Sequence, residues 1–142
     1  MQEWALWALA SAVFAALTAI FAKVGLEGID SNFATFIRTL VIAAALVLFL
    51  TYAKKWQPLG ELGARNWLFL TLSGLATGAS WLAYFKALQM GSASQVAPID
   101  KLSVVLVVVF AVIFLGERPS FREWIGIALI ASGVFTLVFA DK

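Results

Sequence analysis

The sequence predicts an all-α membrane protein, a bundle of five transmembrane helices. Five long apolar stretches fill almost the whole chain of 142 residues. The hydrophobic share is 63%, against about 45–50% in soluble proteins, and the mean hydropathy is +0.96. Only 13% of the residues are charged, which is too few to cover a soluble domain. Since a helix needs about twenty apolar residues to cross a bilayer, each stretch is long enough for one crossing.

The five stretches predict one domain, 1–142, with one helix each. We expect these helices at about 4–24, 33–53, 66–88, 93–115 and 121–140. The first stretch runs without a charge from Trp4 to Ala22. It is too long for the apolar core of a signal peptide and has no basic segment before it. We therefore expect the first spanning helix here, followed by a turn rich in glycine and acidic residues at 25–31.

Turn residues separate the other helices. The loop 54–65 contains one proline and two glycines, which break any helix between the second and third spans. The short segments 90–92 and 116–120 separate the third, fourth and fifth spans. Ser120 and Glu123 have the spacing of a capping box, and this predicts the start of the fifth helix.

The composition excludes several classes of function. The chain has no cysteine and no histidine, so it lacks disulfides, thiol chemistry and the commonest metal ligand. No nucleophile–base pair, acid–base pair or metal set stands at a usable spacing. We therefore expect no enzyme activity, no catalytic residue, no cofactor and no metal. The net charge is only +2 and forms no basic run, so we expect no nucleic-acid partner.

The placement of lysine and arginine predicts the orientation in the membrane. The side that holds the N-terminus carries Lys54, Lys55, Arg65, Arg118 and Arg122. The other side carries Lys23, Arg38, Lys86 and Lys142. Five cations against four is a small positive-inside bias, which predicts a cytoplasmic N-terminus and an external C-terminus in the cell inner membrane. The bias is clear if Lys23 and Arg38 are partly buried, whereas the near balance also permits insertion in both orientations.

Five charged residues are expected in the same half of the membrane: Lys23, Arg38, Lys86, Asp100 and Lys101. An ionisable residue within a span is costly and is a functional-site hypothesis by default. Asp100 lies about 10 Å into the fourth helix at 1.5 Å per residue, and its side chain is too short to reach the headgroups. It is therefore either functional or part of a structural ion pair. The three cations on the first three helices either join it or extend to the headgroups.

The surplus of cations around one carboxylate predicts what this cavity binds. Adjacent helical residues point about 100° apart, so we expect Asp100 and Lys101 not to pair with each other. Each then needs another partner, and Arg38 or Lys86 would serve Asp100. Such a cavity favours an anionic or carboxylate-bearing ligand. Asp100 is also the candidate for carrying a coupling proton, because the chain has no histidine.

Pro98 predicts a helix break beside these charges, because proline removes a backbone donor and frees a carbonyl. Many transporters aim the ends of broken helices at their ligands. The break would leave a helix 99–115, whose positive end Asp100 itself can neutralise. Alternatively, the fourth helix begins only at Pro98. On the third helix, Trp81, Tyr84 and Phe85 are expected either to form a wall of the cavity or to serve ordinary packing.

Four parts of the chain together have the character of a known family. They are Ala22-Lys23-Val24-Gly25-Leu26 with Arg38, then Tyr84-Phe85-Lys86-Ala87-Leu88, then Ser92 to Pro98, and finally Phe114-Leu115-Gly116-Glu117-Arg118 with Trp124 to Val134. Their order and spacing resemble the EamA domain, the five-helix unit of the drug/metabolite transporter superfamily. Many members have a further proline where this chain has Asp100-Lys101-Leu102-Ser103. In this respect the chain resembles the short bacterial and archaeal type with one unit.

The resemblance implies a transporter. Related proteins usually carry two such units of opposite orientation in one chain, so it implies a homodimer, either antiparallel or parallel, within the lipid bilayer. Larger relatives export amino acids and other small metabolites. The implied function is export or exchange of a small-molecule substrate, such as an amino-acid-like or carboxylate-bearing solute, by alternating access as a dimer. The alternative is a non-transporting membrane subunit that assembles with a larger partner.

Overall fold

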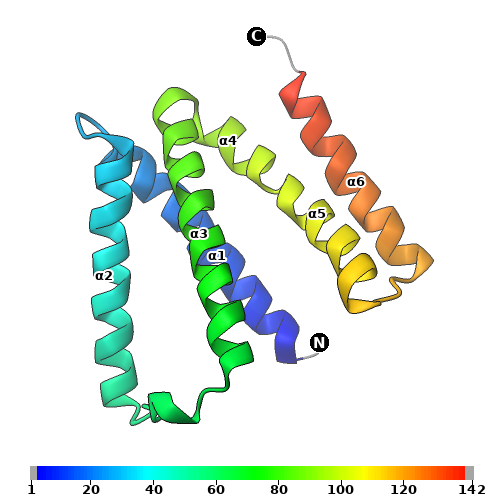
Figure 1. Ribbon diagram of the computed structural model, residues 1–142. Helices are drawn as coiled ribbons and strands as arrows, with labels where there is room; N and C mark the ends of the chain where they lie inside the picture. The colour runs from blue at the N-terminus through cyan, green and yellow to red at the C-terminus, as the bar shows by residue number, and fades with distance from the viewer. Residues whose placement is uncertain (1–2, 140–142) are drawn as a thin grey trace. The chain divides into compact units, whose positions relative to one another are not determined.

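The computed structural model describes residues 3–139, and these form helices joined by short turns. The α-helices are α1 (Glu3–Gly25), α2 (Ser31–Tyr52), α3 (Ala64–Met90), α4 (Ala93–Asp100), α5 (Leu102–Phe110) and α6 (Phe121–Val138) (Figure 1). A 3-10 turn, η1 (Leu59–Glu61), precedes α3, and a π-helical turn, η2 (Ala111–Leu115), follows α5. Within the described range, five segments are long and apolar enough to cross a membrane, with Ala93–Leu115 counted as one. The predicted fold class is confirmed.

The helix ends differ from the expected ones by a few residues, and local hydrogen bonds explain the shifts. The second helix begins at Ser31 rather than at 33, because Asp30 caps it: the carboxylate accepts from the backbone N–H groups of Asn32 at 2.9 Å and Phe33 at 3.1 Å. The predicted capping box at the fifth span is confirmed, since Ser120 and Glu123 bond each other's backbone N–H groups. The expected end of that helix at Ala140, like Lys142, lies outside the described residues.

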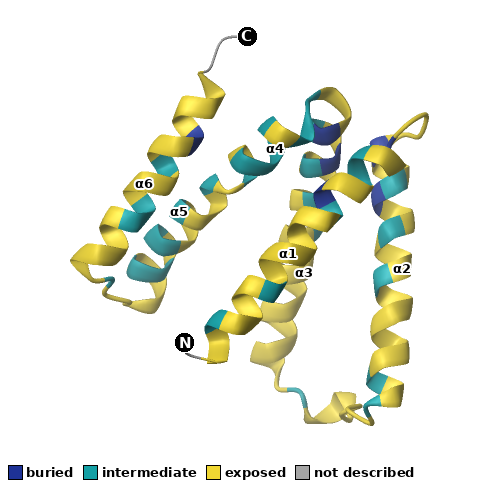
Figure 2. Ribbon diagram, turned by 180° about the vertical axis from the view of Figure 1, so that it is seen from behind, coloured by how far each residue is buried: buried dark blue, intermediate teal, exposed yellow. Residues whose placement is uncertain are grey.

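The chain divides into two compact units, residues 21–90 and residues 1–20 with 91–142. In the unit 21–90, α2 packs against α3. The buried apolar side chains Leu26, Phe85 and Leu88 form its core together with Ser31 and Thr35, and Figure 2 shows buried residues at one end of these helices. The Thr35 hydroxyl donates to the Ser31 carbonyl at 2.8 Å, so the helix itself satisfies this polar group. In the other unit, α6 packs along α4 and α5, with Val134 buried.

The fourth span is interrupted next to its two charged residues. α4 begins at Ala93, so the alternative that the helix begins at Pro98 is wrong. The break lies at Lys101, three residues beyond Pro98, instead of leaving a helix from Ile99. Lys101 N–H bonds to the Pro98 carbonyl at 3.0 Å, and Val104 N–H bonds to the Lys101 carbonyl at 3.0 Å. These three-residue spacings tighten the backbone into a turn one helical turn after the proline.

Most of the long apolar side chains on these helices are exposed, among them Phe14, Leu75 and Phe114. In water this surface would carry a large unfavourable hydration free energy. In a bilayer it contacts lipid chains of equal polarity, while the helices satisfy their own backbone hydrogen bonds. The chain is therefore a multi-pass membrane protein.

Candidate functional site

Arg38 on α2 is held against aromatic rings of α3. Its guanidinium carbon lies 4.2 Å from the centre of the Trp81 ring and 5.2 Å from that of Phe85. Trp81 and Phe85 are four residues apart and share a face of α3, as Thr35 and Arg38, three residues apart, share a face of α2. The packing of these two faces therefore places a cation on a ring surface inside a membrane span. The sequence had predicted both Arg38 and Trp81 as site residues but not this contact.

The stacking stabilises the Arg38 charge only in part. A cation–π contact contributes about 0.5–2 kcal/mol, depending on how far water is excluded, whereas an arginine at the centre of a span costs about 2.5–3.5 kcal/mol. Within residues 21–90, no carboxylate forms an ion pair with Arg38. Neither ring is a conventional hydrogen-bond acceptor for the five N–H donors of the guanidinium. The arrangement is therefore suited to accept an anionic group at the guanidinium edge.

Tyr84 belongs to the same part of α3. Its ring meets the Phe85 ring edge to face, with 6.5 Å between the ring centres, and it is half-buried. The predicted aromatic surface of Trp81 and Tyr84 thus lies beside the Arg38 side chain within one compact unit. Phe85, the third ring of the expected aromatic wall, is buried and supplies the second ring contact of the guanidinium.

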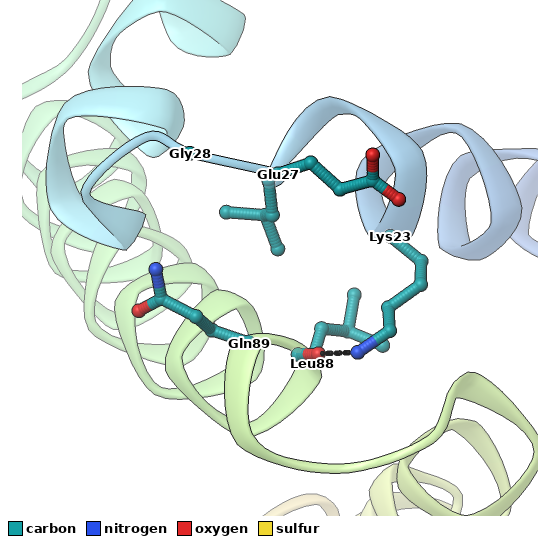
Figure 3. A pocket seen from close by; sticks show the side chains of 6 residues that line it. Lys23, Glu27, Gly28, Leu88 and Gln89 are labelled. Carbon is teal, nitrogen blue, oxygen red and sulfur yellow. Dashed lines mark hydrogen bonds between the residues drawn. The ribbon is translucent and has the colours of Figure 1, made fainter.

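Lys23 contacts the end of α3. Its Nζ donates to the Leu88 carbonyl at 2.6 Å, so the ammonium caps the carbonyl end of that helix (Figure 3). A pocket of about 340 Å³ opens beside this bond. It is lined by Lys23, Leu26, Glu27, Gly28, Leu88 and Gln89. The Gln89 amide also donates to the Ile29 carbonyl at 2.9 Å, which ties α3 to the turn after α1.

Sequence reasoning missed Glu27 and Gln89 as lining residues. Glu27 follows Lys23 by four residues, a spacing that places both on one side of a helical turn and was the available signal. Gln89 carried no comparable signal, because only the folded turn brings Ile29 within its reach. Lys86 is exposed, and its side chain makes no hydrogen bond or ion pair within residues 21–90.

Asp100 and Lys101 pair with each other, contrary to the expectation that adjacent residues cannot. Lys101 Nζ lies 3.3 Å from Asp100 Oδ2. The prediction is wrong for two reasons: the backbone turns at Lys101 instead of continuing as a helix, and the four-carbon lysine chain is long enough to fold back. The side chains are 36% and 54% exposed for Asp100 and Lys101, so the carboxylate is less buried than expected.

The charged residues expected to line one cavity lie in two different compact units. Lys23, Arg38 and Lys86 belong to the unit 21–90, while Asp100 and Lys101 belong to the other unit. The convergence of all five on one cavity stays a prediction. Within residues 3–139, no group of three His, Cys, Asp or Glu side chains could hold a metal ion.

Comparisons with known proteins give a consistent result. Residues 2–139 match the EamA-like transporter family. A protein from Sinorhizobium sp., described as "Uncharacterized transporter in cobO 3'region", is 56% identical over 136 residues, which are 96% of each chain. "Uncharacterized transporter YxxF" from Bacillus subtilis (strain 168) is 27% identical over 135 residues, which are 94% of this chain but 42% of that one. No solved structure matches the chain. The match covers nearly every residue and confirms the resemblance: the chain belongs to the EamA-like transporter family.

Proposed function

We propose that this protein is a transporter, and not an enzyme, that exports or exchanges small amino-acid-like or carboxylate-bearing solutes across the cell inner membrane. The observation that carries the proposal is Arg38, a cation kept inside a span on the faces of Trp81 and Phe85. Family membership supports transport, and the charge of Arg38 supports an anionic group on the solute.

The geometry of Arg38 supports a carboxylate in particular. The two in-plane N–H groups of a guanidinium match the two oxygens of a carboxylate, so the pair forms parallel hydrogen bonds. The contact with the Trp81 ring restricts the position of the guanidinium before the solute arrives, which lowers the entropy cost of binding. The carboxylates of this unit, Glu27, Asp30 and Glu61, form no ion pair with Arg38. A solute carboxylate would therefore supply the ion-pair partner that Arg38 does not find within residues 21–90.

A dimer would complete the transporter. The match covers 42% of the longer Bacillus subtilis relative, which leaves room in that chain for a second unit of similar length. A second copy of this chain would take the place of that second unit. The five-to-four distribution of cations between the two sides supports an antiparallel pair, because it imposes little preference for one orientation. Within the pair, alternating access would expose Arg38 to each side in turn.

Transport itself is tested with purified protein in lipid vesicles. Vesicles preloaded with labelled amino acids and with mono- and dicarboxylates are expected to release at least one of these solutes faster than protein-free vesicles, and external unlabelled solute is expected to accelerate release if exchange operates. Efflux of each label is the measurement. If no label leaves faster than from protein-free vesicles, the chain is instead the non-transporting subunit of a larger assembly.

The antiparallel arrangement is tested separately in cells. Fusions of the C-terminus to a reporter active only in the cytoplasm, and to one active only outside it, are both expected to give signal. The near balance of cations is the physical reason, because neither orientation is strongly favoured. Signal from the external reporter alone would contradict the antiparallel pair and leave a parallel dimer or another partner.

A further inference from the structure

The loop between α2 and α3 concentrates positive charge against local backbone preference. α2 ends in a turn in which Lys54 N–H bonds to the Thr51 carbonyl at 3.3 Å and Lys55 N–H to the Leu50 carbonyl at 3.0 Å. This turn requires a left-handed residue, usually glycine, at the position of Lys54. Lys54 has φ 52, whereas the other described residues with positive φ, Gly28 and Gly116, are glycines. Lysine therefore occupies a position at which glycine would cost less backbone strain.

A second locally unfavourable cation follows this loop, in the first turn of α3. Arg65 is the second residue of α3, where the positive end of the helix dipole repels a cation. Its guanidinium carbon lies 5.9 Å from the centre of the Phe69 ring, one turn along the helix. The negative C-terminal end of the α2 dipole does favour a nearby lysine. Lys55 alone would provide this interaction, even if residue 54 were glycine. Lys54 and Arg65 each occupy a locally unfavourable position, and each adds a positive charge to the connection between α2 and α3. Residues that break a local preference in this way are expected at functional sites.

Exposed apolar side chains lie among these cations, outside the membrane spans. Trp56 is 57% exposed and Leu59 is 66% exposed. The Trp56 indole N–H donates to the Thr51 hydroxyl at 3.1 Å, so its one polar atom is satisfied within the protein. The rest of the ring can therefore enter an apolar phase without leaving a donor unpaired. Cations beside such a ring are typical of the boundary between headgroups and acyl chains.

We propose that Lys54, Lys55, Trp56, Leu59 and Arg65, here named the hairpin surface, bind the headgroups of anionic phospholipids. The three cations pair with lipid phosphates, and Trp56 and Leu59 insert at the acyl boundary. Glu61 is the one carboxylate in this loop, so the surface keeps a net positive charge. Binding holds the α2–α3 hairpin, which carries Arg38 and Trp81, at a fixed depth in one leaflet. The proposal rests on the membrane location and does not depend on the solute.

The test uses the purified full chain in mixed micelles, titrated with phosphatidylglycerol or with phosphatidylcholine. Phosphatidylglycerol is expected to raise the Tm more than phosphatidylcholine does. Replacing Lys55 with glutamine (Lys55→Gln) should weaken the apparent affinity for phosphatidylglycerol about fivefold, the value of one cation near an anionic surface. Lys54→Gly should weaken it similarly and yet raise the Tm without phosphatidylglycerol, because glycine relieves the left-handed backbone. A merely structural role for Lys54 would not separate these two readouts.

Arg118→Gln is the matched control, since it removes an exposed cation from another loop expected on the same side. It should keep the wild-type response to phosphatidylglycerol. Two results would overturn the proposal. In the first, Lys54→Gly and Lys55→Gln bind phosphatidylglycerol with the wild-type affinity. In the second, Arg118→Gln loses as much affinity for phosphatidylglycerol as they do. Glycerol 3-phosphate at equal phosphate concentration should not change the Tm. An equal shift with it would assign the surface to soluble phosphates and not to lipid.

Discussion

Arg38→Lys is expected to lower the transport rate about tenfold, and Arg38→Ala to lower it further. Lysine keeps the charge but loses the planar guanidinium that contacts Trp81 and the paired donors that match a carboxylate. Loss of one charge-assisted hydrogen bond of about 1.4 kcal/mol corresponds to that factor of ten. Initial efflux of the transported solute from vesicles, at several solute concentrations, is the measurement.

The same exchange at an exposed arginine provides the control. Arg122→Lys on α6 is expected to transport like the wild type, because this side chain is exposed and belongs to the other compact unit. The Tm of Arg38→Ala should stay close to that of the wild type, since removing the charge also removes its cost within the span. Wild-type transport by Arg38→Lys and Arg38→Ala would exclude Arg38 from solute binding.

Asp100→Asn is expected to make transport insensitive to a proton gradient. Asp100 is a carboxylate at the break of an apolar span, and the chain has no histidine to carry a proton in its place. Asparagine keeps the shape but has no carboxyl group that could bind or release a proton. Transport by Asp100→Asn with and without an imposed gradient, compared with the wild type, is the measurement. The gradient-dependent part of the rate should disappear.

The ion pair with Lys101 supplies the control for this variant. Asp100→Asn leaves the Lys101 ammonium without the carboxylate that now lies 3.3 Å away. This unpaired charge lowers the transport rate by itself, apart from any effect of losing the proton site. The double variant Asp100→Asn with Lys101→Gln removes both charges and should recover rate while staying insensitive to the gradient. A double variant that regains full proton dependence would show that the pair is structural and that the proton travels elsewhere.

Most of the fold followed from patterns that act over a few residues. The spans came from apolar runs, and the start of α6 came from Ser120 and Glu123, whose bonds need only one helical turn. Pro98 signalled a disturbance of the fourth span, but not its position at Lys101. The exact break depends on which carbonyls the backbone reaches after the proline, and residue spacing alone does not specify this.

The candidate site followed from sequence only as a set of residue types. Charged side chains in apolar spans singled out Arg38, Asp100 and Lys101. The helix period then gave the wrong pairing for Asp100, because it assumed a regular helix where the backbone turns. Gln89 was missed because it reaches Ile29 only through the folded turn after α1.

By itself, the sequence determined a chain of five membrane spans, because lipid demands long apolar helices and tolerates charge at few positions. The order and spacing of its motifs added the resemblance to the EamA family. Tertiary structure decided which group contacts each of these charged side chains. Packing of α2 on α3 set Arg38 over Trp81, and the bend after Pro98 brought Lys101 back to Asp100. The apolar composition of a span can be read from consecutive residues. These contacts depend instead on how the folded backbone brings particular side chains together.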